Sequence, residues 1–236
     1  MHESEAGAGE AGSGGGENGA GGGIASATAG GREGVRIAPS AEVDPRARVG
    51  AGTSVWSGAA IREDAEVGRE CVIGRGAYIG PGVRLGDRVK VQNLAQIYEP
   101  ATVADGAFVG PAVVFTNDLY PRAVTPEGRL KTQEDWDAVG VTVLEGASIG
   151  ARAVCVAPVV VGRWATVAAG AVVAADVPDY GLVVGVPARR VGWIGRAGFP
   201  LVHEGSGSYR CPRTGAGYQE RDGVLSELPE PSDPES

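Results

Sequence analysis

The sequence predicts an all-β fold, a three-sided parallel β-helix built from six-residue repeats. Two columns of inward-pointing residues and a single break in their rhythm carry this prediction. Large residues, nearly all branched aliphatics, recur at every sixth position of the sequence and form the first column. They are Ile37, Val43, Val49, Val55, Ile61, Val67, Ile73, Ile79, Leu85, Val91, Ile97, Val103, Val109 and Phe115, then after the break Val143, Ile149, Cys155, Val161, Val167 and Val173. Neither the 3.6-residue period of a helix nor the alternation of a long strand explains this spacing.

The second column lies two residues before the first and is occupied by small or β-branched residues. Its members are Val35, Ala41, Ala47, Thr53, Ala59, Ala65, Cys71, Ala77, Val83, Val89, Ala95, Ala101, Ala107, Val113, Val141, Ala147, Ala153, Val159, Ala165 and Ala171. One large and one small inward residue in every six suit a triangular prism, which has a short strand on each face and a tight corner between faces. Three repeats make one coil of 18 residues, so the 20 repeats predict six to seven coils, stacked at roughly 4.8 Å per coil.

The two ends of the chain differ in composition from the repeats. Residues 1–34 hold 13 glycines and almost no large apolar side chains, so we expect a disordered tail before a β-helix domain at 35–195. Residues 196–236 form a C-terminal extension that we expect to be partly disordered. From about Ser206 onward its polar composition predicts the same behaviour as the tail, with little contribution to function.

One long loop is predicted inside the repeats, at residues 116–140. Phe115 and Val143 are 28 residues apart, which is not a multiple of six, so the chain between them must leave the prism. A loop of this length inside a regular solenoid is usually functional. Its Asp118 and Arg122 suit a polar ligand, and the alternative is a flap that only ties subunits together.

Polar side chains are predicted to gather where the loop departs. Residues 18 apart lie one above the other, so we expect Glu99 beneath Asn117 and Tyr98 beneath Thr116. Asn93 occupies the same place one repeat earlier, on the preceding face. These residues are candidates for a site, although polar residues on a prism face are more often merely solvated.

Composition excludes several classes of protein. The formal net charge of −8 argues against a nucleic-acid-binding surface. No apolar run reaches the length of a membrane span and no secretory signal pattern is found, so we predict a cytoplasmic protein that does not bind membranes. Three scattered cysteines, Cys71, Cys155 and Cys211, do not make a disulfide framework or a four-cysteine zinc site, so we expect no metal.

Two segments resemble known proteins. They read VQNLAQIYEPATVADGAFVGPAVVFTNDLYPRA (Val91 to Ala123) and VAAGAVVAADVPDYGLVVGVPARRVGWIG (Val167 to Gly195), and both are similar to the nucleotide-sugar 3-N-acetyltransferases. Those are hexapeptide-repeat enzymes that acetylate UDP-linked 3-amino-glucuronates or dTDP-linked 3-amino-6-deoxyhexoses. The resemblance runs from about Val35 to Val202. It implies left-handed winding, acetyl-CoA as cosubstrate, and a homotrimer of parallel prisms with active sites in the clefts between neighbours.

The same resemblance implies which residues form the site. Asn93 and Glu99 would be catalytic, with Asn93 orienting the amine or the thioester carbonyl. The sugar nucleotide would contact Gln92, Tyr98, Phe115, Thr116, Asn117, Asp118 and Arg122, and CoA would contact Ala168, Ala169, Gly170, Pro187, Arg189 and Arg190. This chain departs from the family pattern at two places. The family often reads VTKDVP where this chain has VAADVP at 173–178, and it often has histidine where Ser57 follows Trp56.

The histidine content narrows the chemistry. The only histidines, His2 and His203, lie outside the coils and the loop, which excludes the three-histidine metal site of β-helix carbonic anhydrases and the histidine base of O-acetyltransferases. A sugar amine is partly unprotonated near neutral pH, so positioning can replace a strong base. We predict acetyl transfer to the 3-amino group of a dTDP- or UDP-linked sugar by direct amine attack. Another amine acceptor, such as a 4-amino sugar, and a non-catalytic β-helix scaffold remain the alternatives.

Overall fold

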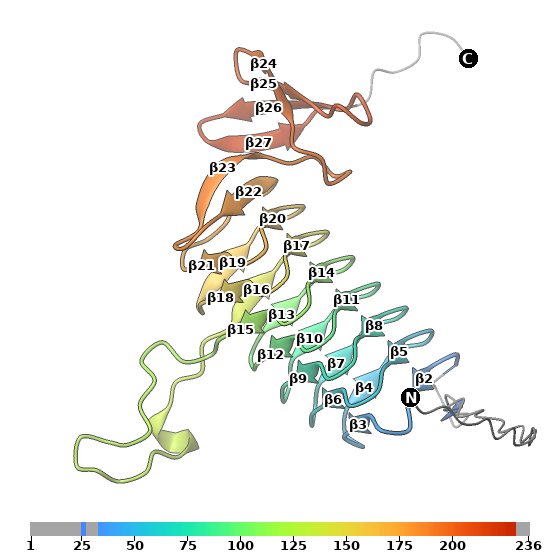
Figure 1. Ribbon diagram of the computed structural model, residues 1–236, viewed down its shortest axis with the longest axis vertical. Coiled ribbons are helices and arrows are strands. Elements are labelled where there is room, and N and C mark those ends of the chain that lie inside the picture. The colour runs from blue at the N-terminus through green and yellow to red at the C-terminus, as the bar shows by residue number, and fades with distance from the viewer. Residues whose placement is uncertain (1–24, 27–32, 230–236) are drawn as a thin grey trace, which may run out of the picture.

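A three-sided prism of short strands forms most of the molecule in the computed structural model, which describes residues 25–26 and 33–229 (Figure 1). The first face contains β1 (Ala25–Ser26), β2 (Arg36–Ile37), β5 (Ser54–Val55), β8 (Val72–Ile73), β11 (Lys90–Val91), β14 (Phe108–Val109), β17 (Ser148–Ile149), β20 (Thr166–Val167), β22 (Gly181–Val184) and β23 (Arg189–Trp193). The second face contains β3 (Glu42–Val43), β6 (Ala60–Ile61), β9 (Tyr78–Ile79), β12 (Gln96–Ile97), β15 (Val114–Phe115), β18 (Val154–Cys155) and β21 (Val172–Val173). The third face contains β4 (Arg48–Val49), β7 (Glu66–Val67), β10 (Arg84–Leu85), β13 (Thr102–Val103), β16 (Val141–Val143) and β19 (Val159–Val161).

The strands of each face pair in parallel, and their register follows the predicted coil of 18 residues. On the first face Ile37 pairs with Val55, and on the second face Ile97 pairs with Phe115. With seven strands on the second face and six on the third, the prediction of six to seven coils is confirmed. The hexapeptide spacing and the parallel stacked coils identify the fold as a left-handed parallel β-helix.

Both predicted columns point into the prism and form one continuous core. Ile97, Ala95 and Val91 are each 0% exposed in the central coils, and only the first coil leaves members of the columns partly exposed. The alternation of large and small residues fills a narrow triangular interior, where every side chain meets those of the coils above and below. Burial of each large aliphatic contributes roughly 1.5–3 kcal/mol of gross stabilisation before the loss of chain entropy.

The long loop leaves the second face and returns to the third. β15 ends at Phe115 and β16 begins at Val141, so residues 116–140 project away from the prism (Figure 1). A bridge between Val124 and Leu130 and a short 3-10 helix, η1 (Gln133–Asp135), give the loop internal structure. On return the register is restored, because β16 stacks on β13 as the next coil would.

The C-terminal extension corrects the sequence-based expectation. Beyond the prism the chain forms a four-stranded antiparallel sheet, the C-terminal sheet, with strands β24 (Val202–Gly205), β25 (Ser208–Arg210), β26 (Gly217–Arg221) and β27 (Val224–Glu227). The expectation that the chain is unstructured from about Ser206 is wrong as far as 229. A second core of Trp193, Cys211, Tyr218 and Leu225 stabilises this sheet. Trp193 belongs to β23, the last strand of the first face, so the composition of the extension alone does not reveal this contact.

The predicted N-terminal tail lies largely outside the described residues, which omit 1–24 and 27–32. Within the tail, β1 pairs antiparallel with β2 and covers the open edge of the first coil, where unpaired backbone groups would otherwise face solvent. For those two residues the expectation of an unstructured chain is replaced by a strand. Residues 230–236 also lie outside the described part.

Candidate active site

A recurring side-chain hydrogen bond organises the corners of the prism. The side-chain oxygen of a corner residue accepts the backbone N–H of the residue 18 positions earlier. Asp87 accepts from Arg69 at 2.7 Å, Asn93 accepts from Arg75 at 2.8 Å, and Asp105 accepts from Asp87 at 2.9 Å. The side-chain carbonyl of Asn93 therefore has a structural role. The two N–H groups of its exposed amide remain available to a ligand.

Glu99 occupies the next position of this series but has no backbone donor beneath it. The residue 18 positions earlier is Pro81, which has no N–H. Oε2 of Glu99 is buried and has no hydrogen-bond partner within the described residues. This oxygen lies over Gly80, where an added Cβ would approach it to 2.5 Å. A buried acceptor without a partner is rare in folded proteins, so this carboxylate is the strongest candidate for a functional group.

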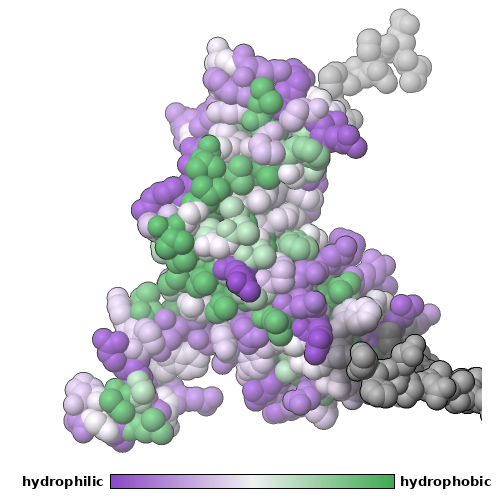
Figure 2. All heavy atoms as spheres, in the orientation of Figure 1, coloured by the Kyte–Doolittle hydropathy of each residue, from purple (hydrophilic) through white to green (hydrophobic). Residues whose placement is uncertain are grey.

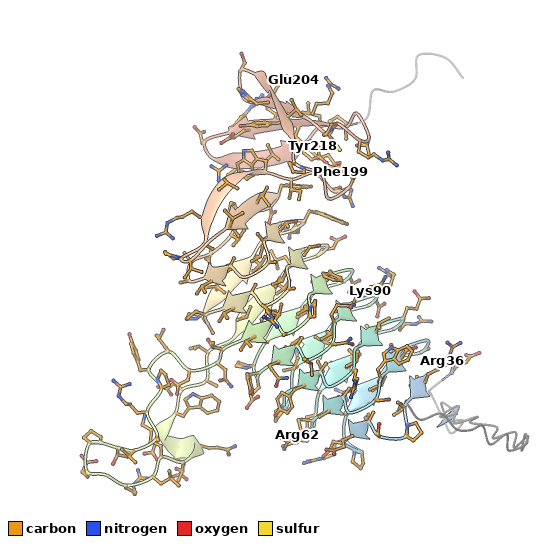
Figure 3. All side chains as sticks on the ribbon, in the orientation of Figure 1. Arg36, Arg62, Lys90, Phe199, Glu204 and Tyr218 are labelled. Carbon is orange, nitrogen blue, oxygen red and sulfur yellow. The ribbon has the colours of Figure 1, made fainter. Side chains whose placement is uncertain are left out.

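Aromatic and cationic side chains surround Glu99 on the second face. The rings of Tyr98 and Tyr78 lie 5.4 Å apart between centroids, and Nη1 of Arg62 donates to the Tyr78 hydroxyl at 3.3 Å. Burial raises the pKa of Tyr78, and the negative charge of Glu99 acts in the same direction. Figure 3 shows Arg62 on the lower coils of the prism. Tyr78 and Arg62 were missed in the sequence, although Arg62 lies two coils below Tyr98 in the same column.

The residues at the neck of the loop mainly hold the loop itself. The hydroxyl of Thr116 accepts the amide of Ala157 at 3.0 Å, and the backbone carbonyl of Asn117 accepts the amide of Val139 at 3.1 Å. Within the loop, Oδ1 of Asp118 accepts the amide two residues further along at 2.8 Å. The pairing of β12 with β15 ends at Phe115, two residues before Asn117. The stacking of Asn117 on Glu99 therefore stays a prediction.

The remaining sugar-side candidates differ in their access to a ligand. Phe115 is 0% exposed inside the prism, which corrects its assignment as a substrate contact, because an inward core side chain cannot reach a ligand outside. Gln92 is half-buried at a corner, and Arg122 is exposed in the loop, where its Nη1 donates to the neighbouring carbonyl of Pro121 at 2.8 Å. Within the loop Arg129 forms an ion pair with Asp135 at 2.6 Å.

Asn93 and Glu99 lie at two different corners of the prism. Asn93 follows β11 of the first face, whereas Glu99 follows β12 of the second face, where the loop also departs. Within the described residues no side-chain hydrogen bond joins Asn93 and Glu99, and one prism presents them at separate corners.

The corner of Asn93 continues toward the predicted CoA residues. Successive coils place Asn93, Pro111, Ala151 and Ala169 in one column, linked by backbone bonds such as Gly170 N–H to Ala151 at 2.8 Å. Asn93 and Ala169 are three coils apart, or about 14 Å. Of the three predicted CoA amides, those of Ala168 and Gly170 donate to neighbouring coils, and only that of Ala169 has no partner within the described part of the chain.

The predicted phosphate ligands lie in the hairpin between β22 and β23. Pro187 is in the turn, and the exposed side chains of Arg189 and Arg190 follow it. Nη1 of Arg189 donates to the carbonyl of Ala188 at 2.9 Å, and the guanidinium of Arg190 lies over the ring of Trp193. Among the described residues neither arginine has a carboxylate within ion-pair distance, so both cations are available to an anionic ligand.

Cys155 does not supply a nucleophile at this site. Cys155 is fully enclosed in the core, and burial raises the pKa of its thiol to about 12, so a nucleophilic thiolate is not available there. In the portion of the chain that the structure describes, no three metal-ligating side chains gather closely enough to hold an ion. That portion also contains no helix long and apolar enough to cross a membrane.

Comparison with known proteins agrees with the repeats and the fold. The model of the hexapeptide repeat of succinyl-transferase matches residues 64–93 and 140–175. The chain is 38% identical over 94 residues to the dTDP-3-amino-3,6-dideoxy-alpha-D-galactopyranose 3-N-acetyltransferase of Aneurinibacillus thermoaerophilus, covering 39% of this chain and 47% of that relative. The chain thus spans about half the length of the curated relative it matches.

Two solved structures are similar as well. A point mutant of AntD, an N-acyltransferase from Bacillus cereus in complex with dTDP and Coenzyme A, has a TM-score of 0.50 at 18% identity, covering 70% of this chain and 83% of that one. A point mutant of perosamine N-acetyltransferase from Caulobacter crescentus, in complex with CoA and GDP-perosamine, has a TM-score of 0.37 at 27% identity, covering 69% and 58%. This chain folds its hexapeptide repeats into a left-handed parallel β-helix, and over 94 residues it is similar in sequence to a nucleotide-sugar 3-N-acetyltransferase.

Proposed function

We propose that the protein transfers the acetyl group of acetyl-CoA to the 3-amino group of a dTDP- or UDP-linked amino sugar. The observation that carries this proposal is the carboxylate of Glu99, which lacks a partner at the corner where the loop leaves the prism. A carboxylate with one buried, unpaired oxygen is suited to accept a proton from an amine that it also orients. Sequence similarity to a 3-N-acetyltransferase supports the choice of acceptor.

The chemical step is a direct acyl transfer. The neutral amine attacks the thioester carbonyl, a C–N bond forms, the C–S bond breaks, and CoA leaves as a thiolate. Glu99 takes the proton released by the amine and passes it to solvent or to the departing thiolate. The free side-chain N–H groups of Asn93 donate to the carbonyl oxygen while negative charge develops on it. Because the amine is itself the nucleophile, the step requires no histidine.

The loop and the last coils would bind the two substrates. Arg122 is exposed in the loop without a carboxylate partner among the described residues, and a guanidinium binds a diphosphate or a sugar carboxylate through two parallel hydrogen bonds. CoA would lie along the column from Asn93 to Ala169, with its phosphates toward Arg189 and Arg190. This orientation directs the thioester toward the Asn93 corner.

The complete site is proposed to form between subunits of a homotrimer. One chain holds Asn93 and Glu99 at separate corners, and in the proposed trimer a neighbouring prism supplies one of them. In the projecting loop Leu119, Tyr120 and Leu130 are exposed, and Figure 2 shows hydrophobic surface on this loop. Such residues are suited to packing against a second copy.

Mixing two inactive variants tests this shared site. Asn93→Ala and Glu99→Gln are each expected to lose most turnover as pure trimers. Dissociating and reassociating an equal mixture should restore wild-type composition at about a quarter of the sites, because each site takes one residue from each neighbour. Activity of the mixture no higher than that of the parents would place both residues in one chain, and sedimentation would show whether trimers form.

Substrate selection is tested by a panel of acceptors. The full chain is incubated with acetyl-CoA and UDP- and dTDP-linked 3-amino sugars, with the matching 4-amino sugars as controls, and acetylation is followed by mass spectrometry. We expect acetylation of a 3-amino sugar and little of its 4-amino isomer. Preference for the 4-amino isomer would refute the proposed acceptor. Absence of heat on calorimetric titration with CoA would favour a scaffold.

A further inference from the structure

The C-terminal sheet and the last strand of the prism share one tryptophan. Trp193 ends β23 and is buried in the second core against residues of the C-terminal sheet. The sheet sits on the end of the prism that carries β22 and β23 (Figure 1). The position of any side chain that packs on this tryptophan therefore depends on the C-terminal sheet as well as on the prism.

A bulge in β23 brings Arg190 onto the same tryptophan. Val183 of β22 pairs with Arg190, but the preceding residue of β22 pairs with Gly192, so Val191 is an extra residue in β23. In a regular strand residues three apart face opposite sides, and one inserted residue returns them to the same side. The guanidinium carbon of Arg190 lies 4.0 Å from the centroid of the Trp193 ring, within the range of a cation–π contact.

Two side chains of the C-terminal sheet in turn fix the indole. Nε1 of Trp193 donates to Oε2 of Glu220 at 2.9 Å, and the Tyr209 hydroxyl donates to the same oxygen at 2.9 Å. These two donors lower the pKa of Glu220, so its carboxylate is ionised at neutral pH. The plane of the Trp193 ring, and with it the surface on which Arg190 rests, is thus set from β25 and β26.

Arg190 lies close to the column predicted to hold the acyl donor. β23 pairs with β22, which pairs with β20, the strand that precedes Ala168 and Ala169. Two strand spacings amount to about 10 Å. No ion pair engages Arg190 within the described residues, so a cation of fixed direction stands at the end of the column.

We propose that Glu220, acting through Trp193, is a positioning residue that directs the guanidinium of Arg190 toward the phosphates of CoA. This inference rests on the proposed function and deepens it, since it gives the C-terminal sheet a part in binding the acyl donor. A guanidinium held in advance by its surroundings loses less conformational entropy when it binds phosphate. The alternative is that the same contacts serve only to attach the sheet to the prism.

Glu220→Ala removes the acceptor of both hydrogen bonds, and Glu220→Gln keeps an oxygen that can accept them. We expect Glu220→Ala to raise the Kd for CoA about tenfold, the change expected when one hydrogen bond to a charged group is lost. Glu220→Gln should remain close to wild type, and Tyr209→Phe should give a smaller rise. Pantetheine, which lacks the phosphates, should bind wild type and Glu220→Ala equally in the same calorimetric assay.

Glu204→Ala is the matched control, because Glu204 lies on the same sheet but pairs with Arg210 at 2.7 Å. Figure 3 shows Glu204 at the far end of the sheet from the prism, so its loss should leave CoA binding unchanged. Unaltered CoA binding by Glu220→Ala would overturn the inference, as would equal weakening of CoA and pantetheine with a lower melting temperature. If wild type itself does not bind CoA, the proposed function fails first.

Discussion

Replacing Glu99 by glutamine is expected to lower kcat by about 10²- to 10⁴-fold, the contribution usually made by a general acid or base. The amide of glutamine occupies the same space over Gly80 but cannot accept the amine proton. The affinity for CoA should not change, since the proposed CoA contacts come from the column of Asn93 to Ala169 and from Arg189 and Arg190, and not from Glu99. Steady-state kinetics with acetyl-CoA and the preferred acceptor measure kcat, and calorimetry measures the Kd for CoA.

Two further variants separate this role from a structural one. Asp87→Asn changes a carboxylate at the equivalent corner position, but asparagine can still accept the amide of Arg69, so activity should stay at the wild-type level. Pro81→Ala gives residue 81 a backbone N–H that can donate a hydrogen bond to Glu99. Because this bond would engage the free carboxylate oxygen, we expect slower turnover in a protein that folds normally. Turnover by Glu99→Gln at the wild-type rate would remove Glu99 from the mechanism.

Replacing Phe115 by alanine is expected to lower the free energy of unfolding by about 3–5 kcal/mol, as for other buried phenylalanines. Phe115 is 0% exposed and is among the largest fully buried side chains of the molecule. The alanine leaves a void in the coil from which the loop departs, and the backbone there is held by strands above and below. Urea denaturation followed by circular dichroism measures the change.

Phe108→Ala provides the matched comparison. Phe108 points outward and is 37% exposed, so its loss should change stability by only about 0.5 kcal/mol. Folded Phe115→Ala should bind CoA as wild type does. A variant of normal stability with weakened binding of the sugar nucleotide would instead return Phe115 to the substrate site.

The prism could be predicted from the sequence because its contacts follow from spacing alone. A side chain such as Ile97 meets the residues 18 positions before and after it, so the register is written into the repeat. The same arithmetic could have identified Glu99 as an exceptional carboxylate. Pro81 stands 18 residues before it, and a proline at that position cannot donate to an acceptor above.

The assignment of Phe115 as a substrate contact was wrong for a related reason. Its place in the inward column already required burial, but the similarity of the surrounding segment to a family of enzymes outweighed that pattern. Likewise the hydroxyl of Thr116 fits a polar site in the sequence, whereas in the structure it accepts the amide of Ala157 in the next coil. Sequence similarity indicates the region of a site, whereas packing and hydrogen bonding determine which of its atoms are available to a ligand.

By itself the sequence determined the three faces, the inward columns and the place where the loop leaves, because a six-residue period repeats the same local contacts along the prism. Only the tertiary structure decided that the C-terminal sheet is ordered and that Arg190 rests on Trp193. Those features depend on an extra residue in β23 and on contacts from Glu220 and Tyr209. No period links these residues, so their meeting follows from how the chain folds back on the prism.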